Sequence, residues 1–502
     1  MGSGDTAMAS YINRCDKCIH GALEKIMGTA EGGIDKVKRE ELALPGKLGG
    51  LGITELKSTA PAAYISTVIS LLPTLRTAAP RLHDFFLSAM DNDTFFVNYA
   101  YRQLLLDAEW HDGSAARGDP PFPIPPTAKK AVTSAAASEK HFMSNRQSRI
   151  HKNIMSILMR ATTTGSRADR RFAKMQYARF MSVAGKTAYH WLGTIPKESR
   201  LAIVPIWFPG HLFKIAIQFR CGFKCVRPEV VGTTCKCKCR KTNCRFTIDA
   251  YGWHLVACAI GGWRTDRHDF VNEKYAWGCK TAGNDVCTTR TDKLVQSLPS
   301  HAVDKGRRRQ IRIPDAIITT PMGEAQLTDV MITRAHETAK QPLVNAKKAE
   351  QGKVNKYANF KQKCEDEDAR DPRLQREVIP IVFESHGAAA PATTEHMALM
   401  RHHFGHLVLP VEDNSSTQVF FSTWTHQVST ALQLGNANMI HNIPLGNRCK
   451  SRLQGDIQVD STQQEVEKYL ALRLQPDTSH GSYPEAGESD TESDGESRPA
   501  EE

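Results

Sequence analysis

Hydrophobic positions recur at helical spacing through most of the first half of the chain. Residues 53–75 are rich in apolar side chains and predict a pair of buried helices, interrupted at Pro61 and at Pro73. Residues 209–221 repeat apolar side chains at helical spacing, which predicts a helix with one face toward a core. We therefore expect this half to be mainly helical.

From about residue 263 the spacing changes. A helical stretch is followed by short runs rich in β-branched side chains, with one further helical stretch at 342–363. The expected strands are residues 311–319, 325–333, 378–384 and 406–411. Strands that alternate with helices predict an α/β fold, here a mixed sheet flanked by helices.

Composition divides the chain further. Five of the seven residues at 120–126 are proline, which excludes a helix or a central strand there. From residue 476 the chain is rich in Ser, Gly, Asp and Glu, which is typical of disorder. We expect six segments: a helical segment at 1–118, a proline-rich linker at 119–127, a basic helical region at 128–234, a cysteine-rich segment at 235–262, an α/β domain at 263–455 and a polar to acidic disordered tail at 456–502.

The chain is basic except at its end. It has 65 Lys and Arg against 54 Asp and Glu, a formal charge of +11, and its last 27 residues hold nine acids against the single Arg498. The remainder carries about +19 and favours polyanionic partners, because Lys and Arg release counterions from phosphates. No run of 18 apolar residues is present, so no membrane-spanning helix is expected.

Residues 128–193 combine many cations with few acids. Their helices would present a positive surface, which is either an ordinary solvated face or a surface that follows nucleic acid. The cations are Arg146, Arg149, Lys152, Arg160, Arg167, Arg170, Arg171 and Lys174.

The cysteines gather in one part of the chain. Nine of the 13 lie between Cys221 and Cys287. Three thiolates and an imidazole within 20 residues suit tetrahedral Zn²⁺, so we expect a zinc knuckle rather than free core cysteines. The expected ligands are Cys239, Cys244, His254 and Cys258, with Cys235 and Cys237 as alternatives for the first position.

Two aspartates flank a predicted hairpin. Asp315 opens the apolar part of the run at 311–319, Asp329 stands near the end of 325–333, and residues 321–323 suit a turn between them. Antiparallel pairing would bring the two carboxylates together. Paired hard oxygen ligands are what Mg²⁺ requires beside a phosphodiester, so this pair is a candidate magnesium site.

Cationic residues lie on both sides of this pair in the sequence. Lys353 and Tyr357 are one turn apart on the predicted helix at 342–363, and Lys356 lies beside them. A lysine near a metal-bound water can orient it and stabilise the developing negative charge. An upstream stretch suited to phosphate contains Arg307, Arg308, Arg309 and Arg312.

The cysteine–histidine, aspartate and lysine motifs, in their order along the chain, resemble the C-terminal part of site-specific non-LTR retrotransposon proteins. That class carries a cysteine–histidine knuckle followed by a restriction-like endonuclease of the PD-(D/E)XK superfamily. The matching motifs are residues 254–258, 261–262, 267–269, 314–315, 329–330, 353–357 and 378–387. Residues 49–53 and 60–64 are similar to the region that follows the reverse-transcriptase palm in such proteins.

The resemblance implies roles for individual residues. It implies that Asp315 and Asp329 hold Mg²⁺, and that Lys353 is the catalytic lysine, with Lys356 the next choice and Lys347 and Lys348 as alternatives. On the helix that enters the active site it implies DNA contacts by Arg267 and His268 and a further catalytic acid, Glu273. Tyr357 and the arginine stretch would also contact nucleic acid. An ordinary restriction-like enzyme has its lysine two residues after the second acid, where this chain has Met331.

The same resemblance implies a Mg²⁺-dependent endonuclease that nicks DNA and contains structural Zn²⁺. The alternative is a catalytically inactive zinc-containing nucleic-acid-binding protein of retroelement origin. Reverse transcription is not expected, because the sequence lacks the Asp-Asp pair that such polymerases need. The implied partners are DNA, retroelement RNA and a separate reverse transcriptase, without a membrane, and the implied location is the nucleus.

Overall fold

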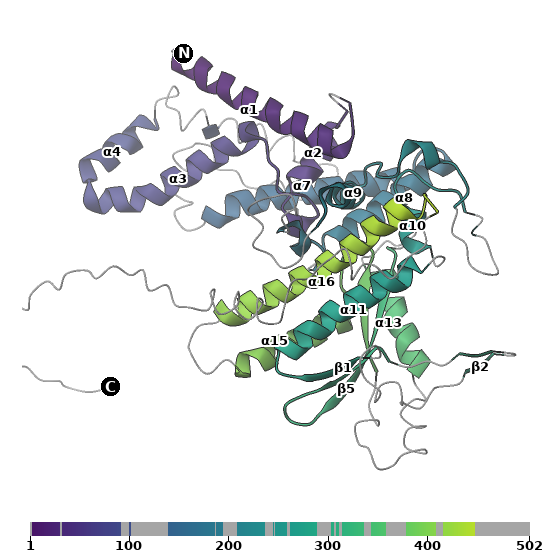
Figure 1. Cartoon of the computed structure of the whole chain (residues 1–502). Coiled ribbons are helices and arrows are strands. Elements are labelled where there is room, and N and C mark those ends of the chain that lie inside the picture. The colour runs from purple at the N-terminus through teal and green to yellow at the C-terminus, as the bar shows by residue number, and fades with distance from the viewer. Residues whose placement is uncertain are drawn as a thin grey trace, which may run out of the picture. The chain divides into compact units, whose positions relative to one another are not determined.

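Helices form most of the described N-terminal half, and a mixed sheet lies in the C-terminal half (Figure 1). The computed structural model describes residues 3–30, 33–91, 100–101, 139–185, 187–193, 208–235, 244, 246–258, 262–288, 303–305, 308–310, 314–335, 343–357, 378–407 and 415–446. All of them belong to one unit, Met1–Ile457. The proline-rich linker at 119–127 and the acidic tail expected at 456–502 lie outside the described residues.

The N-terminal helices follow the apolar spacing. They are α1 (Ser3–Met27), α2 (Lys36–Ala43), α3 (Leu56–Ala78), α4 (Pro80–Ala89), α7 (Glu139–Ala161), α8 (Arg167–Val183) and α9 (Gly210–Cys221), with short 3-10 turns at Gly46–Leu48, His190–Gly193 and Pro228–Val230. A capping box formed by Ser166 and Asp169 starts α8. Gly222, at φ 70°, ends α9 in the left-handed conformation that glycine adopts without strain.

The helix pair expected at residues 53–75 is instead the single helix α3. It runs through both Pro61 and Pro73. Each proline removes only one backbone hydrogen bond, and the turns on either side keep theirs, so a long helix can continue past it. Among the side chains of α3 that the structure describes, Val68 and Leu72 are buried, but Leu71 is half exposed, so this part of the helix is less buried than expected.

The sheet has the strand order β1-β4-β5-β6. Strands β1 (Asp285–Thr288), β4 (Ala316–Thr319) and β5 (Ala325–Thr333) pair antiparallel in turn, and β6 (Val378–Glu384) pairs parallel to β5. The parallel step is bridged by α13 (Val344–Tyr357), which packs on both strands. A separate small ribbon joins β2 (Val303–Lys305) to β3 (Arg308–Gln310). The expectation of a mixed sheet with flanking helices is confirmed.

Expected strand limits hold for β5 and β6 and shift elsewhere. Strand β4 begins at Ala316, while residues 311–313 lie outside the described residues. The strand expected at 406–411 is wrong at its start, because His406 and Leu407 end helix α15 (Pro391–Leu407). The remainder of that run, 408–411, lies outside the described residues.

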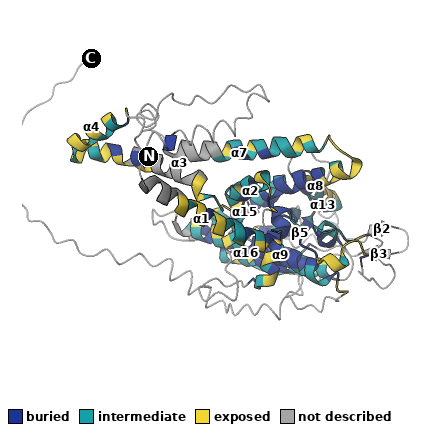
Figure 2. Ribbon diagram, turned by 90° about the horizontal axis from the view of Figure 1, so that it is seen from above, coloured by how far each residue is buried: buried dark blue, intermediate teal, exposed yellow. Residues whose placement is uncertain are grey.

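Two long helices, α11 (Trp263–Thr281) and α16 (Ser415–Asn442), lie side by side in Figure 1. Each supplies a glycine against a large side chain of the other. A Cβ on Gly278 would lie 2.0 Å from the indole of Trp424, and one on Gly435 would lie 2.4 Å from Arg267. The buried residues in Figure 2 gather around α8, α9 and β5. Helix α11 also packs against β5.

Candidate functional site

The hairpin expected between the two aspartates is present and brings them together. Ala316 pairs with Thr328, and the backbone amide of Asp315 donates to the carbonyl of Thr328 at 2.8 Å. The next position in this antiparallel register places Asp315 opposite Asp329. Asp315, Asp329 and His268 each offer a ligand atom, and these atoms all lie within 4.8 Å of one another.

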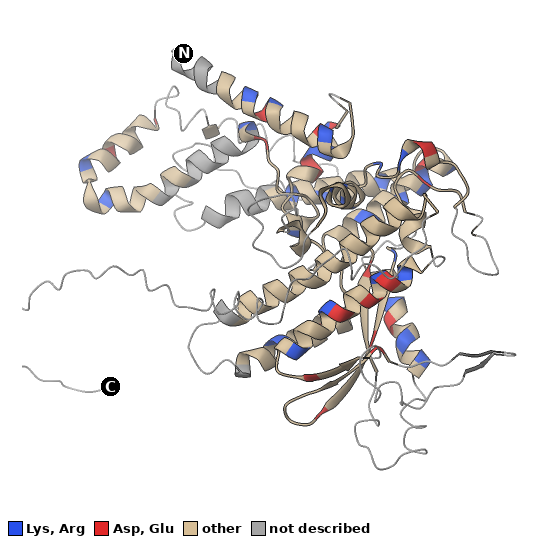
Figure 3. Cartoon of the chain, in the orientation of Figure 1, with Lys and Arg blue, Asp and Glu red and all other residues tan. Residues whose placement is uncertain are grey.

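Helix α13 presents two lysines to Asp329. The Nζ atom of Lys353 contacts Oδ1 of Asp329, and Nζ of Lys356 lies 2.8 Å from Oδ2. The hydroxyl of Tyr357 donates to the same Oδ2 at 2.7 Å and also contacts Lys356. Lys347 and Lys348 are exposed on another part of α13, so of the four candidate lysines only Lys353 and Lys356 reach the aspartate. Lysines recur along this helix, where they are blue in Figure 3.

His268, on α11, holds Asp315 in place. Its Nε2 lies 3.0 Å from Oδ2 of Asp315 and 3.1 Å from the carbonyl of Val330, and its Nδ1 lies 3.1 Å from Oδ1 of Asp269. The backbone amide of Val330 donates to the same Asp315 oxygen at 2.7 Å. Burial alone would lower the pKa of His268, but the two carboxylates outweigh it and raise that pKa to about 10.

The two aspartates have opposite pKa shifts. Burial would raise the pKa of Asp329, but Lys353 and Lys356 outweigh it and lower that pKa to about 2. Burial raises the pKa of Asp315, His268 opposes it and the charge of Asp329 adds to it. Carboxylates with pKa values pushed apart are typical of functional sites. The buried pair of carboxylates is also a donor set that could hold a divalent cation.

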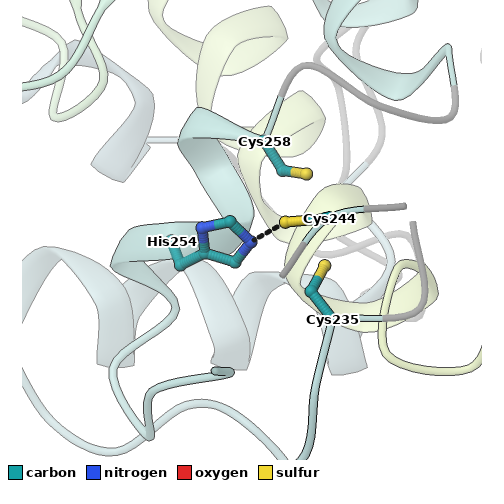
Figure 4. Close-up of side chains that lie close together, drawn as sticks. All are labelled: Cys235, Cys244, His254 and Cys258. Atoms are coloured by element: carbon teal, nitrogen blue, oxygen red, sulfur yellow. Dashed lines mark hydrogen bonds between the residues drawn. The ribbon is translucent and has the colours of Figure 1, made fainter. Parts of the chain in front are cut away.

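A second cluster contains three cysteines and one histidine (Figure 4). The sulfurs of Cys235, Cys244 and Cys258 and the imidazole of His254 point toward one another, again with ligand atoms within 4.8 Å. Cys244 Sγ lies 3.3 Å from His254 Nε2. Three buried thiols and an imidazole form a Cys₃His set that could hold a metal such as zinc.

Backbone contacts assemble this cluster. A bridge between Thr234 and Thr247, with the amide of Cys235 donating to the carbonyl of Phe246 at 2.8 Å, forms one side. On the other side the carboxylate of Asp249 accepts hydrogen bonds from the amides of Tyr251, Trp253 and His254 and so fixes the start of helix α10 (Trp253–Ala257).

The first position of the cluster is occupied by Cys235, one of the alternatives. Cys239 and Cys237 lie outside the described residues. Sequence spacing could not choose between the three cysteines, because any of them lies within loop reach of Cys244. Asp249 and Asp269 were not anticipated. Asp249 stands three residues before Gly252, the N-cap of α10, so the usual N-cap signal does not mark it. Asp269 belongs to the matching stretch 267–269, but nothing there marks it as the partner of His268.

Two residues expected to contact nucleic acid are buried. Arg267 is only 2% exposed, and its Nη1 donates to the carbonyl of Val256 at 2.9 Å and to Oδ1 of Asn436 at 2.6 Å. Arg267 is therefore a link between α10, α11 and α16, and the expected DNA contact is corrected. Tyr357 is likewise buried, among Ile317, Leu327 and Val378, and supports Asp329 instead.

The other expected residues fall in three groups. Glu273 lies away from the aspartates: it is about 140° around α11 from His268, is exposed, and pairs with Lys274 at 3.2 Å. It is therefore not brought to the site as the expected catalytic acid. Arg308 and Arg309 belong to β3, and their side chains are not described. Arg307 and Arg312 lie outside the described residues.

Comparison with known proteins adds no assignment. No protein-family model matches this sequence. A search of curated proteins likewise yields no match. Among the residues that the structure describes, no helix is both long and apolar enough to cross a bilayer.

Proposed function

We propose that the protein is a Mg²⁺-dependent endonuclease that nicks DNA. The observation that carries this proposal is the contact of Asp329, in β5, with both Lys353 and Lys356 of α13, while Asp315 faces the same point from the start of β4. The proposal is also supported by the order of the sequence motifs, which resembles that of site-specific non-LTR retrotransposon proteins. We accordingly favour a restriction-like fold for the domain around this sheet.

The residues of the site suit hydrolysis of a phosphodiester. Mg²⁺ bound by Asp315 and Asp329 would polarise the phosphate and activate water. Because the pKa of Asp329 is lowered to about 2, this carboxylate stays ionised at neutral pH. Lys353 and Lys356 bring positive charge to the place where the phosphorane becomes more negative. His268 and the Val330 amide keep Asp315 oriented.

In the proposed reaction, water attacks phosphorus. The new P–O bond forms from water, the bond between phosphorus and O3′ breaks, and the proton that water loses is balanced by the proton that the O3′ oxyanion gains. The products are a 5′-phosphate and a 3′-hydroxyl. A 3′-hydroxyl is the end that a separate reverse transcriptase would extend, and this partner, retroelement RNA and a nuclear location are proposed from the resemblance alone.

We assign structural Zn²⁺ to the Cys₃His cluster, with Cys235 as the first ligand. The cluster lies in a buried core that includes Phe219, Ile248, Leu255 and Ile440. A metal at this point would tie the loop around Cys244 to helix α10 and to this core, a structural role typical of closed zinc sites.

The test is conversion of supercoiled plasmid to open circle in the presence of Mg²⁺. Wild type should nick the plasmid, and Asp315→Asn and Asp329→Asn should each lose at least about 99% of the rate. Sequencing across the nick should show a 3′-hydroxyl. Equal nicking by all three proteins would contradict the catalytic assignment and leave nucleic-acid binding without catalysis as the function.

A further inference from the structure

A cleft of about 870 Å³ opens beside the Cys₃His cluster. Its walls come from α8, from the segment that carries the cluster, from the start of α11 and from the last residues of β5. Three of the cluster's four residues, Cys244, His254 and Cys258, line it. None of the roles described above uses this cleft.

Aromatic rings stand open to solvent in the cleft. Phe246 is 69% exposed and Phe172 is 40% exposed, although both are large apolar side chains. Phe246 stacks on His254 with ring centroids 5.2 Å apart, and Phe172 lies 5.8 Å from Trp253. Each ring is thus backed by another ring while part of its own surface is exposed, which is the form of platform on which flat ligands stack.

The charge of the cleft is strongly positive. Arg171, Arg264 and Arg334 are exposed along it and come from three different elements: α8, α11 and the residue after β5. Its single acidic lining residue, Asp249, has its carboxylate occupied by three backbone amides. A ligand with a flat apolar part and repeated negative charges would be complementary to this lining.

The cleft is continuous with the aspartate site along the chain. Residues 331–334 line it, and the first of them, Met331, directly follows Val330, whose amide and carbonyl contact Asp315 and His268. Met331 is two residues from Asp329, about 7 Å along β5, so one end of the cleft lies close to the aspartate site.

We propose that this cleft binds unpaired nucleotides of a DNA strand, with bases stacked on Phe246 and Phe172 and phosphates facing Arg171, Arg264 and Arg334. The choice of DNA rests on the proposed endonuclease function. Duplex DNA would not serve, because its bases are stacked on each other and leave no face for the two rings. The structure thus assigns the segment around the Cys₃His cluster a part in holding the strand, besides its structural role.

The experiment measures binding of a fluorescein-labelled oligothymidylate of about 12 nucleotides by fluorescence anisotropy. It uses the full chain in buffer without Mg²⁺ and without chelator, so that cleavage is absent and zinc is retained. Phe246→Ala and Phe172→Ala should each weaken binding by about ten-fold. Arg264→Ala should weaken it several-fold and reduce the slope of log affinity against log salt by about 1.

Controls separate this inference from misfolding and from the endonuclease proposal. Phe85→Ala, which removes a ring that is 64% exposed on α4, should bind as wild type does. Zinc content and melting temperature show whether Phe246→Ala keeps its fold, and Phe172, which touches no cluster ligand among its ring contacts, gives a second variant. Unchanged affinity in both phenylalanine variants would overturn the inference, as would at least ten-fold tighter binding of duplex DNA or of oligouridylate. Neither outcome depends on whether the Asp variants nick plasmid.

Discussion

The Nζ atom of Lys356 lies 2.8 Å from Oδ2 of Asp329, although 26 residues separate them in the chain. Helix α13 crosses the sheet between β5 and β6, and this crossing brings Lys353, Lys356 and Tyr357 over the one aspartate. The carboxylate thus has a cation at each oxygen, and its position in a parallel-paired strand keeps it fixed.

The two lysines should matter for nicking while their neighbours should not. Lys353→Ala and Lys356→Ala should each slow Mg²⁺-dependent nicking by about 100-fold, because each removes positive charge from the site of reaction. Lys347→Ala is the matched control, since it changes an exposed lysine of the same helix. Single-turnover plasmid assays measure the effect. Equal rates for Lys347→Ala and the two site variants would contradict it.

Zinc binding should depend on Cys235 and not on Cys239. Cys235→Ser and Cys244→Ser should each lower the zinc content from about one ion per chain to less than about half, because a closed site needs all four ligands. Cys279→Ser, at a buried thiol of α11 outside the cluster, should retain zinc. Atomic absorption of the purified proteins measures this. Loss of zinc in Cys239→Ser but not in Cys235→Ser would reverse the ligand assignment.

Substitution of Arg267 should lower the free energy of unfolding. Arg267→Met leaves the backbone carbonyl of Val256 and the side-chain Oδ1 of Asn436 without their donor inside the protein and should cost about 2 kcal/mol or more in the free energy of unfolding. Arg264→Met, one turn earlier and exposed, should change it by less than about 0.5 kcal/mol. Urea unfolding curves measure both. Equal stabilities for the two variants would mean that the buried bonds contribute nothing.

A buried ion pair should make the helical half sensitive to acid. Arg179 and Lys38 lie 2.7 and 2.8 Å from the two carboxylate oxygens of Glu41. Burial would raise the pKa of Glu41, but Arg179 and Lys38 outweigh it, so that pKa is below its usual value. A lowered pKa in the folded state means that stability is present above the usual glutamate pKa and is lost as the pH falls below it.

Between about pH 5 and pH 3, wild type should therefore lose stability more steeply than Glu41→Gln, whose side chain does not titrate. Melting temperatures across this range measure the difference. Parallel curves for wild type and Glu41→Gln would show that the carboxylate has the same pKa in the folded and unfolded states.

The sequence is informative where contacts are local. Asp315 and Asp329 are joined by one tight hairpin, so antiparallel pairing alone brings them together. The next helix along the chain contains Lys353 and Lys356, so both lysines could be recognised as candidates from the sequence. The sequence could not show which lysines face inward, because that depends on the angle at which α13 crosses the sheet. Burial also depends on residues far away in the sequence. Arg267 and Tyr357 have side chains typical of a surface, but α16 covers the first and the sheet covers the second.

The central claim is that the carboxylate of Asp329 takes part in metal-dependent hydrolysis. Its most direct test is the single-turnover rate of plasmid nicking across a series of Mg²⁺ concentrations for wild type, Asp329→Asn and Glu324→Gln, the last changing an exposed acid in the turn of the same hairpin. The wild-type and Glu324→Gln rates should rise and saturate together, with Asp329→Asn at least about 100-fold slower at every concentration. A rate for Asp329→Asn that equals the wild-type rate at any Mg²⁺ concentration would contradict the claim.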